Sequence, residues 1–384
     1  MGPLHGLKII ELAGIGPAPF AAMLLADLGA TVIRIDRPTP ASLGIERPIQ
    51  HQLQLRNRQS LAVDLKSTLG RELVLALLDE ADGLIEGFRP GVTERLGLGP
   101  DTCLARRPCL VYGRMTGWGQ TGPLSQAAGH DLNYIAITGV LDWMGRSGQP
   151  PTPPLNLVGD YGGGGLYLAL GMLAAVLEAR QSGRGQVVDA AIVDGTASLA
   201  TTIFGLHAAG LMGARGSNIL DGGAPFYDVY CCQDNQYISI APIEPKFFDD
   251  LCRRLDLAPG TLGAQHDRQT WPQTREVLQQ LFASKTRDEW CQLLEGTDVC
   301  FAPVLSAAEA PHHPHLQARQ TFVDIEGVRQ PAPAPRFSRT VPDLPTPPQS
   351  PTLQTQAAAL QAWLGPQAAQ RWIQALASGR DVVN

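Results

Sequence analysis

Two side chains that could move protons stand thirty positions apart in this sequence. His130 lies in the run Gly129-His130-Asp131, and Asp160 shortly precedes four glycines at positions 162–165. A histidine and a carboxylate on opposite sides of one carbon can remove a proton from one face and return it to the other, without a metal or redox cofactor. The two residues are therefore a candidate acid and base, provided that the fold brings them together.

Each of the two residues also has a purely structural interpretation. A lone histidine near a strand end is commonly a structural residue, and Asp160 could cap the apolar helix that the sequence predicts from Gly162 to Arg180. A helix that begins there would also point backbone N–H groups at a developing negative charge. The backbone from Asp160 to Gly162, or the Asp131 amide, is then expected to stabilise an oxyanion.

The elements that must position these residues alternate between strands and helices. Apolar runs predict strands at 7–11, 31–36, 61–65, 83–88 and 110–114, with helices at 17–28 and 71–80 between them. Residues 187–191 are expected to start the next element, followed by a helix at 192–210. Such alternation favours an α/β fold with a parallel sheet covered by helices.

Loops after the predicted strands carry the candidate ligand-binding residues. The loop at 13–19 follows a strand and opens a helix, but the third glycine of a dinucleotide fingerprint is missing and prolines occupy the turn. Arg37, Arg89 and Arg95 follow other strands, at the sheet edge where α/β proteins bind ligands. Guanidinium groups at that edge suit phosphate, although Arg95 could equally be a solvated surface charge.

A second, smaller unit is predicted after a glycine-rich stretch at 213–223, which is typical of a linker. Strands at 227–232 and 237–241 predict a hairpin, and helices are expected at 245–255, 271–284 and 286–294. We therefore expect a large domain at 1–212, completed by 320–384, and a small α+β domain at 213–319. The proline-rich stretch at 331–351 should be extended, before a helix at 354–376 that is interrupted near 365–366.

Composition excludes several classes of function. The net charge of −6 argues against a nucleic-acid surface, although a local arginine cluster can still bind a phosphate. The seven cysteines are scattered without a C-x-x-C pair or zinc-like histidine spacing, so no metal site is expected. No signal peptide or membrane span is expected either, and the chain is predicted to be cytoplasmic.

Seven short motifs, taken in order, resemble those of the α-methylacyl-CoA racemases, which belong to the family III CoA-transferase superfamily. They are Glu11-Leu12-Ala13-Gly14, Arg34-Ile35-Asp36-Arg37-Pro38, Phe88-Arg89-Pro90-Gly91-Val92, Thr116-Gly117-Trp118-Gly119-Gln120, Gly129-His130-Asp131, Pro154-Leu155-Asn156-Leu157 and Gly222-Gly223-Ala224-Pro225. The resemblance runs from Leu7 to about Pro303. So many ordered matches are far more specific than any one motif.

The resemblance implies an interlocked homodimer, each subunit having a Rossmann-like large domain and a smaller α+β domain, with acyl-CoA as the substrate and no separate cofactor. It implies that His130 and Asp160 are the acid and base and that Glu244 of the partner subunit supports His130. The implied substrate-binding residues are Ile15, Arg37, Val63, Leu84, Arg89, Arg95, Gly129, Asp131 and Tyr134, with the three arginines near the CoA phosphates.

Two activities are compatible with this resemblance. The first is racemisation of 2-methylacyl-CoA thioesters by 1,1-proton transfer through an enolate. The second is CoA transfer, in which Asp160 forms a covalent acyl anhydride. Asp160 suits both activities, whereas only racemisation needs a second proton-transfer group, and His130 therefore favours the racemase.

Overall fold

The computed structural model describes residues 1–39 and 44–378, which form two compact units. The first unit comprises residues 1–138, 155–200 and the chain from residue 320, and the second comprises residues 139–154 and 201–319. Relative to the predicted ranges, the second unit also takes residues 139–154 and 201–212. Contacts within it explain why, because Trp143 packs edge-on against Phe204 and Arg215 binds the Asp142 carboxylate at 2.7 Å.

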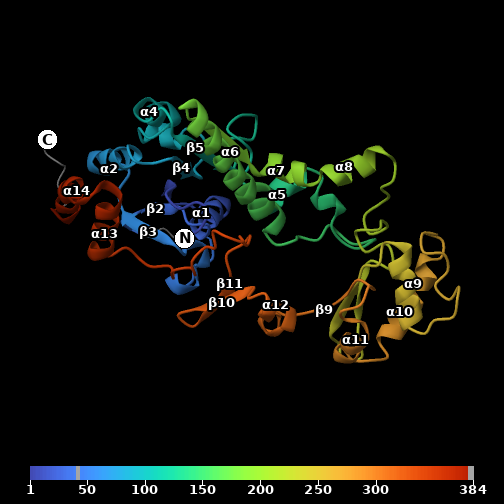
Figure 1. Ribbon diagram of the computed structural model, residues 1–384. Coiled ribbons are helices and arrows are strands. Elements are labelled where there is room, and N and C mark those ends of the chain that lie inside the picture. The colour runs from blue at the N-terminus through green and yellow to red at the C-terminus, as the bar shows by residue number, and fades with distance from the viewer. Residues whose placement is uncertain (40–43, 379–384) are drawn as a thin grey trace. The chain divides into compact units, whose positions relative to one another are not determined.

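A six-stranded parallel sheet forms the centre of the first unit (Figure 1). Its strands are β1 (Lys8–Leu12), β2 (Thr31–Asp36), β3 (Arg58–Ala62), β4 (Gly83–Glu86), β5 (Val111–Thr116) and β6 (Val187–Ala191). They lie in the order β3-β2-β1-β4-β5-β6, with every neighbouring pair parallel. This order is Rossmann-like and confirms the predicted fold class. It changes direction between β1 and β4, where folds of this type bind their ligands at the carboxyl ends of the strands.

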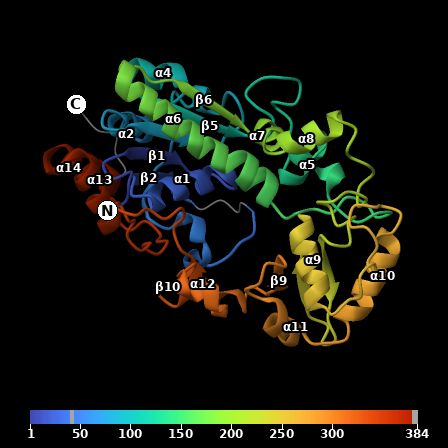
Figure 2. The same ribbon diagram turned by 45° about the vertical axis from the view of Figure 1, so that its right-hand side comes forward.

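Alternate residues of each strand point to opposite sides of the sheet, and apolar side chains lie on both sides. Helices therefore cover both faces (Figure 2). On one face Ile9, Val32 and Ile85 pack with α1 (Pro17–Asp27) and α6 (Tyr167–Ser182). On the other face Ile10, Ile33 and Leu84 pack in a second core, to which four further helices contribute. These are α2 (Thr68–Leu78), α4 (Pro100–Arg106), α13 (Leu353–Leu364) and α14 (Pro366–Ser378). The break between α13 and α14 at Gly365 confirms the predicted interruption of the last helix.

The long apolar helix of the first unit begins earlier than predicted and has two parts. Residues Leu157–Leu166 form a π-helix, η4, which continues directly into α6. The combined helix, Leu157–Ser182, is long and apolar enough to span a membrane, but half of its most apolar window is buried inside the protein. A core helix of a parallel-sheet unit has these same properties, and α6 packs against the sheet as such a helix.

The second unit is a small α+β structure around its own core. An antiparallel sheet joins β7 (Asp228–Cys231), β8 (Tyr237–Ile240) and β9 (Phe301–Val304), and α9 (Pro245–Arg254), α10 (Trp271–Phe282) and α11 (Arg287–Leu294) pack on it. The predicted hairpin and three helices are confirmed, while β9 was not predicted.

The glycine-rich stretch expected to be a linker lies inside this second unit. The Asp221 carboxylate accepts hydrogen bonds from the N–H groups of Gly216 and Asn218, at 2.8 Å each. Asn218 is itself buried, and its side-chain oxygen accepts from the Gly213 N–H. The linker interpretation was therefore wrong, because side-chain oxygens pair the backbone groups that the glycines expose.

Short elements complete the two units. They are α3 (Val92–Arg95), α5 (Asp131–Ile137), α7 (Ile192–Leu199), α8 (Thr201–Ala208), α12 (Pro314–Ala318), the hairpin β10 (Phe322–Ile325) and β11 (Val328–Pro331), and the 3₁₀ turns at Ile49–His51, Leu53–Leu55, Leu141–Trp143 and Ala310–His312. The helix predicted at 192–210 is thus divided into α7 and α8 at Ala200.

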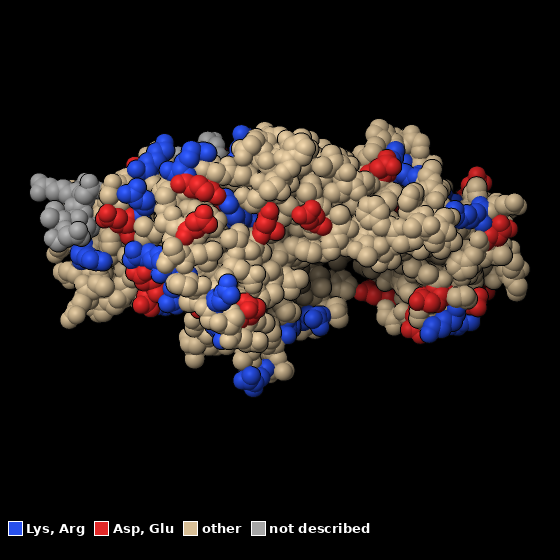
Figure 3. Space-filling model, turned by 90° about the horizontal axis from the view of Figure 1, so that it is seen from above, with Lys and Arg blue, Asp and Glu red and all other residues tan. Residues whose placement is uncertain are grey.

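On the face drawn in Figure 3, basic and acidic side chains are interspersed, and broad areas carry neither kind of charge.

Candidate active site

A pocket of about 630 Å³ opens at the carboxyl ends of β1, β4 and β5, entirely within the first unit. It lies beside the point where the strand order reverses, as the topology leads one to expect. The loop after β1, the turn after β4, the segment after β5 and the π-helix η4 supply its walls. The lining residues used below are Ile15, Gly16, Phe88, Arg89, Trp118, Gly129, His130, Asn133, Tyr134 and Asp160.

His130 lies on the wall of this pocket, at the start of α5. It is the residue that precedes the helix, and its backbone N–H donates to the Asn133 side-chain oxygen at 3.0 Å. The backbone of His130 is thereby fixed, while the residue as a whole remains exposed. An imidazole at an exposed position on a pocket wall can exchange protons with a bound molecule and with solvent.

Gly129 is required by the aromatic side chains beside it. A Cβ atom at Gly129 would lie 2.7 Å from the Tyr134 ring and 2.9 Å from the Trp118 ring. The Tyr134 hydroxyl donates to the Gly129 carbonyl, and the two rings meet edge-on with centroids 4.6 Å apart. These contacts form the pocket wall next to His130.

Asp160 lies on the same pocket, but it does not cap a helix. It is the fourth residue of η4, whose preceding residue is Asn156, so the capping interpretation was wrong. The Asn156 side chain donates to the Asp160 carboxylate at 3.2 Å. The carboxylate is therefore held by the residue just before the helix and lies on the pocket wall.

The glycine run allows η4 to pack closely against its neighbours. A Cβ at Gly163 would lie 2.5 Å from the Thr196 hydroxyl in α7, and one at Gly164 would lie 2.9 Å from Pro17 in α1. Side chains at these positions would push the helix away from both neighbours. The run thus sets the depth of Asp160 through close packing, rather than through a flexible loop.

Asp131 fixes the backbone that carries Asp160. It is buried, and its carboxylate accepts a hydrogen bond from the Asp160 N–H at 2.7 Å and another from the Gly159 N–H. Because the Asp160 N–H already has this partner, it is not free to stabilise an oxyanion as expected. The Asp131 N–H belongs to the first turn of α5, where N–H groups have no partner within the helix.

Burial and neighbouring charges change the acidity of these groups. Burial raises the pKa of Asp160, and the nearby Asp131 carboxylate raises it further, whereas the Asn156 hydrogen bond and His130 lower it. Burial also raises the pKa of Asp131, against the two backbone hydrogen bonds that lower it. A carboxyl group whose pKa is raised is a stronger base than a free carboxyl group, which favours its taking up a proton from a bound molecule.

The predicted ligand-binding residues divide into two groups. Ile15, Arg89, Gly129 and Tyr134 line the pocket. Arg37 is exposed after β2, and Arg95 is exposed at the end of α3 with its guanidinium near Gly91; neither lines this pocket. Val63 and Leu84 lie in the hydrophobic core with at most 3% of their surface exposed, and neither lines this pocket.

Glu244 lies in the second unit, as the residue preceding α9. Its carbonyl accepts from the N–H groups of Phe247 and Phe248, at 3.0 and 3.1 Å, and the residue is exposed. Its predicted contact with His130 of another subunit is not tested by one chain and stays a prediction.

A second cavity, of about 920 Å³, shares Ile15, Gly16 and Asp160 with the first. Asn156 and Tyr161 line it as well. Sequence reasoning gave Asn156 no role of its own, although its spacing of four residues before Asp160 is the available signal. No group of three or more His, Cys, Asp or Glu side chains that could hold a metal occurs in the described part of the chain.

Comparison with known sequences identifies relatives of this chain. The profile of the CoA-transferase family III matches residues 4–356. An α-methylacyl-CoA racemase from Mus musculus is 44% identical over 91% of this chain and 90% of its own length. One from Homo sapiens is 41% identical over 89% and 88%, whereas a human succinyl-CoA:glutarate CoA-transferase is 26% identical over 88% and 81%.

Comparison with solved structures gives the same family. A CaiB/BaiF family protein from Brucella suis superposes with a TM-score of 0.79 at 27% identity, over 94% of this chain and 99% of that one. The match covers both units, so the shared fold extends along nearly the whole chain. The chain belongs to the CoA-transferase family III.

Proposed function

We propose that this protein is an α-methylacyl-CoA racemase, which interconverts the 2R and 2S forms of 2-methylacyl-CoA thioesters. The observation that carries the proposal is that His130 and Asp160 line one pocket at the switch point of the sheet. The high identity to named racemases over some nine-tenths of the chain supports the same reaction.

In the proposed reaction one of the two groups removes the proton from the carbon next to the thioester. Electrons move into the thioester carbonyl and form an enolate, and the other group then protonates the opposite face of the carbon. His130 acts as a base when neutral and as an acid when protonated, and the raised pKa of Asp160 suits it to the complementary role. After one turnover the first group carries the proton and the second group has lost its own. Both groups regain their starting forms through the reverse reaction or through proton exchange with water.

The CoA part of the substrate supplies binding energy and no chemistry of its own, so we propose no separate cofactor or metal. Arg89 lines the pocket and is placed to meet an anionic part of CoA. Arg37 and Arg95, which lie outside the pocket lining, would contact only a ligand that extends beyond it. Binding outside the reacting centre holds the thioester in place during the proton transfer.

We also propose that the enzyme is a cytoplasmic homodimer in which Glu244 of the partner subunit supports His130. The exposed side of α6 favours such an association, because Leu170 and Leu177 are 65% and 62% exposed. Leu166, just before α6, is 50% exposed at a spacing that continues the same side of the helix. Apolar patches of this kind commonly mark protein contacts.

The reaction can be tested in D₂O with one enantiomer of a 2-methylacyl-CoA. We expect loss of optical purity, measured by chiral chromatography, together with deuterium at the α-carbon, measured by NMR. His130→Ala should abolish the loss of optical purity while leaving CoA binding intact. If the α-proton never exchanges, and CoA instead moves to an added carboxylate acceptor, the protein is a CoA-transferase acting through Asp160 and the proposal is wrong.

A further inference from the structure

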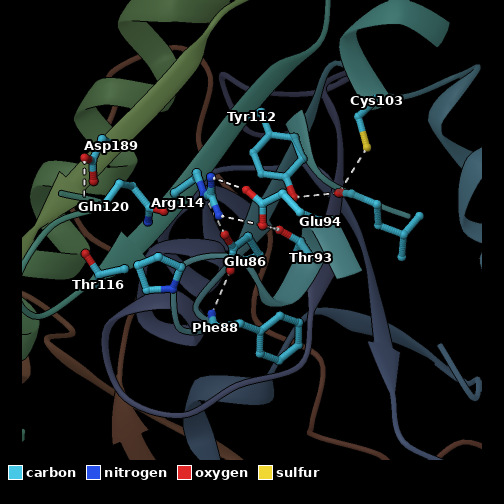
Figure 4. Close-up of polar contacts among 12 residues, drawn as sticks. Glu86, Phe88, Thr93, Glu94, Cys103, Tyr112, Arg114, Thr116, Gln120 and Asp189 are labelled. Carbon is cyan, nitrogen blue, oxygen red and sulfur yellow. Dashed lines mark hydrogen bonds and ion pairs between the residues drawn. The ribbon is translucent and has the colours of Figure 1, made fainter. Parts of the chain in front are cut away.

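Beneath the candidate active site lies a chain of ion pairs that the proposed reaction does not use (Figure 4). Glu86 and Arg114 stand opposite each other in the parallel pairing of β4 and β5. The Arg114 Nε donates to Glu86 Oε1 at 2.9 Å. Glu86 has no exposed surface, and neither residue lines the pocket.

The same arginine reaches the short helix α3. Its two terminal nitrogens donate to the two oxygens of Glu94, at 2.8 and 3.3 Å, and the Thr93 hydroxyl donates to Glu94 at 3.2 Å. Figure 4 shows the Arg114 guanidinium between the carboxyl groups of Glu86 and Glu94. Because Glu94 directly precedes Arg95, these ion pairs fix the helix that carries Arg95, the third of the predicted CoA-binding arginines.

The other oxygen of Glu86 holds the turn that enters the pocket. Glu86 Oε2 accepts a hydrogen bond from the Phe88 N–H at 2.7 Å. Phe88, Arg89 and Pro90 then follow, and all three line the pocket. One buried carboxylate thus supports the pocket-lining turn directly and the α3 helix through Arg114.

We propose that Glu86 is a positioning residue for acyl-CoA binding. It holds Arg89 at the pocket through the Phe88 backbone, and it holds the α3 helix that carries Arg95 through Arg114. This proposal rests on the proposed function, because it assigns the held residues to CoA. Glu86 touches no substrate and takes no part in proton transfer. Its role is to limit the orientations open to the arginines, so that less ordering is needed when the ligand binds.

A buried carboxylate that must stay ionised makes this arrangement sensitive to pH. Burial raises the pKa of Glu86 to about 7, against the Phe88 hydrogen bond and the Arg114 charge, which lower it, while Glu94 raises it. Tyr112 of β5 is the other titratable group facing Glu86, and burial keeps its hydroxyl protonated. Protonation of Glu86 would weaken the Arg114 ion pair, so CoA affinity should fall as the pH decreases through 7.

The test measures CoA binding directly, by calorimetric titration of the full chain from pH 5.5 to 8.5. We expect Glu86→Gln to raise the Kd for CoA about tenfold at pH 8, the order of one charge-assisted hydrogen bond. The ratio of the Kd of Glu86→Gln to that of the wild type should fall as the pH decreases through 7. Dividing the two curves removes the titration of CoA itself and of every other group that both proteins share.

Asp27→Asn is the matched control. Asp27 is also a buried carboxylate of the first unit, 4% exposed, and it pairs with the buried Arg56, whose Nε lies 3.0 Å from it, away from the pocket. We expect this variant to lose stability without any change in CoA affinity or in its pH dependence. An equal loss of CoA affinity in Asp27→Asn would overturn the proposal, since the loss would then follow from removing any buried ion pair and not from the position of Glu86.

A Kd in Glu86→Gln equal to that of the wild type at every pH would also overturn the proposal. If Glu86→Gln does not fold, Glu94→Gln replaces it, because the Glu94 side chain is 44% exposed. That variant should raise the Kd about threefold, the order of one weaker, half-exposed ion pair, and an unchanged Kd would be decisive against the proposal. If the wild type binds CoA and neither variant changes the Kd, only this inference is refuted. If the wild type binds no CoA, the proposed function is refuted.

Discussion

Replacing Asp131 by asparagine tests the most specific feature of the site, the carboxylate that fixes the backbone of Asp160. Two backbone N–H groups, of Gly159 and Asp160, donate to it, the second at 2.7 Å. Asparagine has only one acceptor oxygen, and its amide hydrogens would face the other N–H. The substitution therefore removes one charge-assisted hydrogen bond and leaves a buried donor unpaired.

The magnitude follows from these contacts. Losing one such bond costs about 2 kcal/mol of the free energy of unfolding. For a unit of this size that loss lowers Tm by about 4–8 °C. The effect on catalysis should be larger than the loss of folded protein explains, because a displacement of about 1 Å at a reacting group costs on the order of 100-fold in rate. We therefore expect α-deuterium exchange by folded Asp131→Asn to be about 100-fold slower.

The assay combines thermal unfolding with deuterium exchange measured well below Tm. Asp82→Asn is the matched control, because the Asp82 carboxylate also accepts a backbone N–H, that of Lys8 at 2.8 Å, but at the amino ends of β1 and β4. The control should lose comparable stability and keep the wild-type exchange rate. Wild-type exchange in folded Asp131→Asn, or an equal loss in Asp82→Asn, would refute the reasoning.

Three further substitutions have distinct expected outcomes. Asp160→Asn should abolish racemisation yet raise Tm at neutral pH. The folded pKa of Asp160 is raised, so ionisation costs stability at pH values above its unfolded pKa of about 4, and the gain in Tm over wild type should vanish in thermal scans below that pH. Gly129→Ala should lower stability by about 1–3 kcal/mol in denaturant titrations, since its Cβ meets Tyr134 and Trp118; a neutral result would contradict the close packing. Glu244→Gln should slow exchange while leaving Tm within about 1 °C, because its side chain is exposed; unchanged kcat would remove its proposed role.

Much of the first unit was predictable because its signals are local. Each predicted strand of the sheet appears within a few residues of its expected place, and the run from Pro17 forms a helix as its sequence pattern requires. The hairpin and three helices of the second unit were predictable for the same reason. By contrast, β9 and the hairpin β10–β11 were not predicted, since short strands are specified by partners far away in the sequence.

The residues that a sequence pattern singles out share one pocket, whereas the residues that act through packing were not named from the sequence. His130, Asp160, Arg89 and Tyr134 were named from the sequence and line one pocket. Leu84 was also named, but its side chain lies in the core. A motif marks which residues stand near a ligand, and it does not show which side of a strand each side chain faces.

The sequence by itself determined the alternation of strands and helices, the family, and the two residues with the chemistry for proton transfer. Only the tertiary structure decided that Asp160 lies within a π-helix, that Asp131 holds its N–H, and that Glu86 and Arg114 support the turn carrying Arg89. The physical reason is that strand and helix periodicity is written in neighbouring residues. The hydrogen bonds and ion pairs that orient the site join residues that are brought together only when the sheet forms.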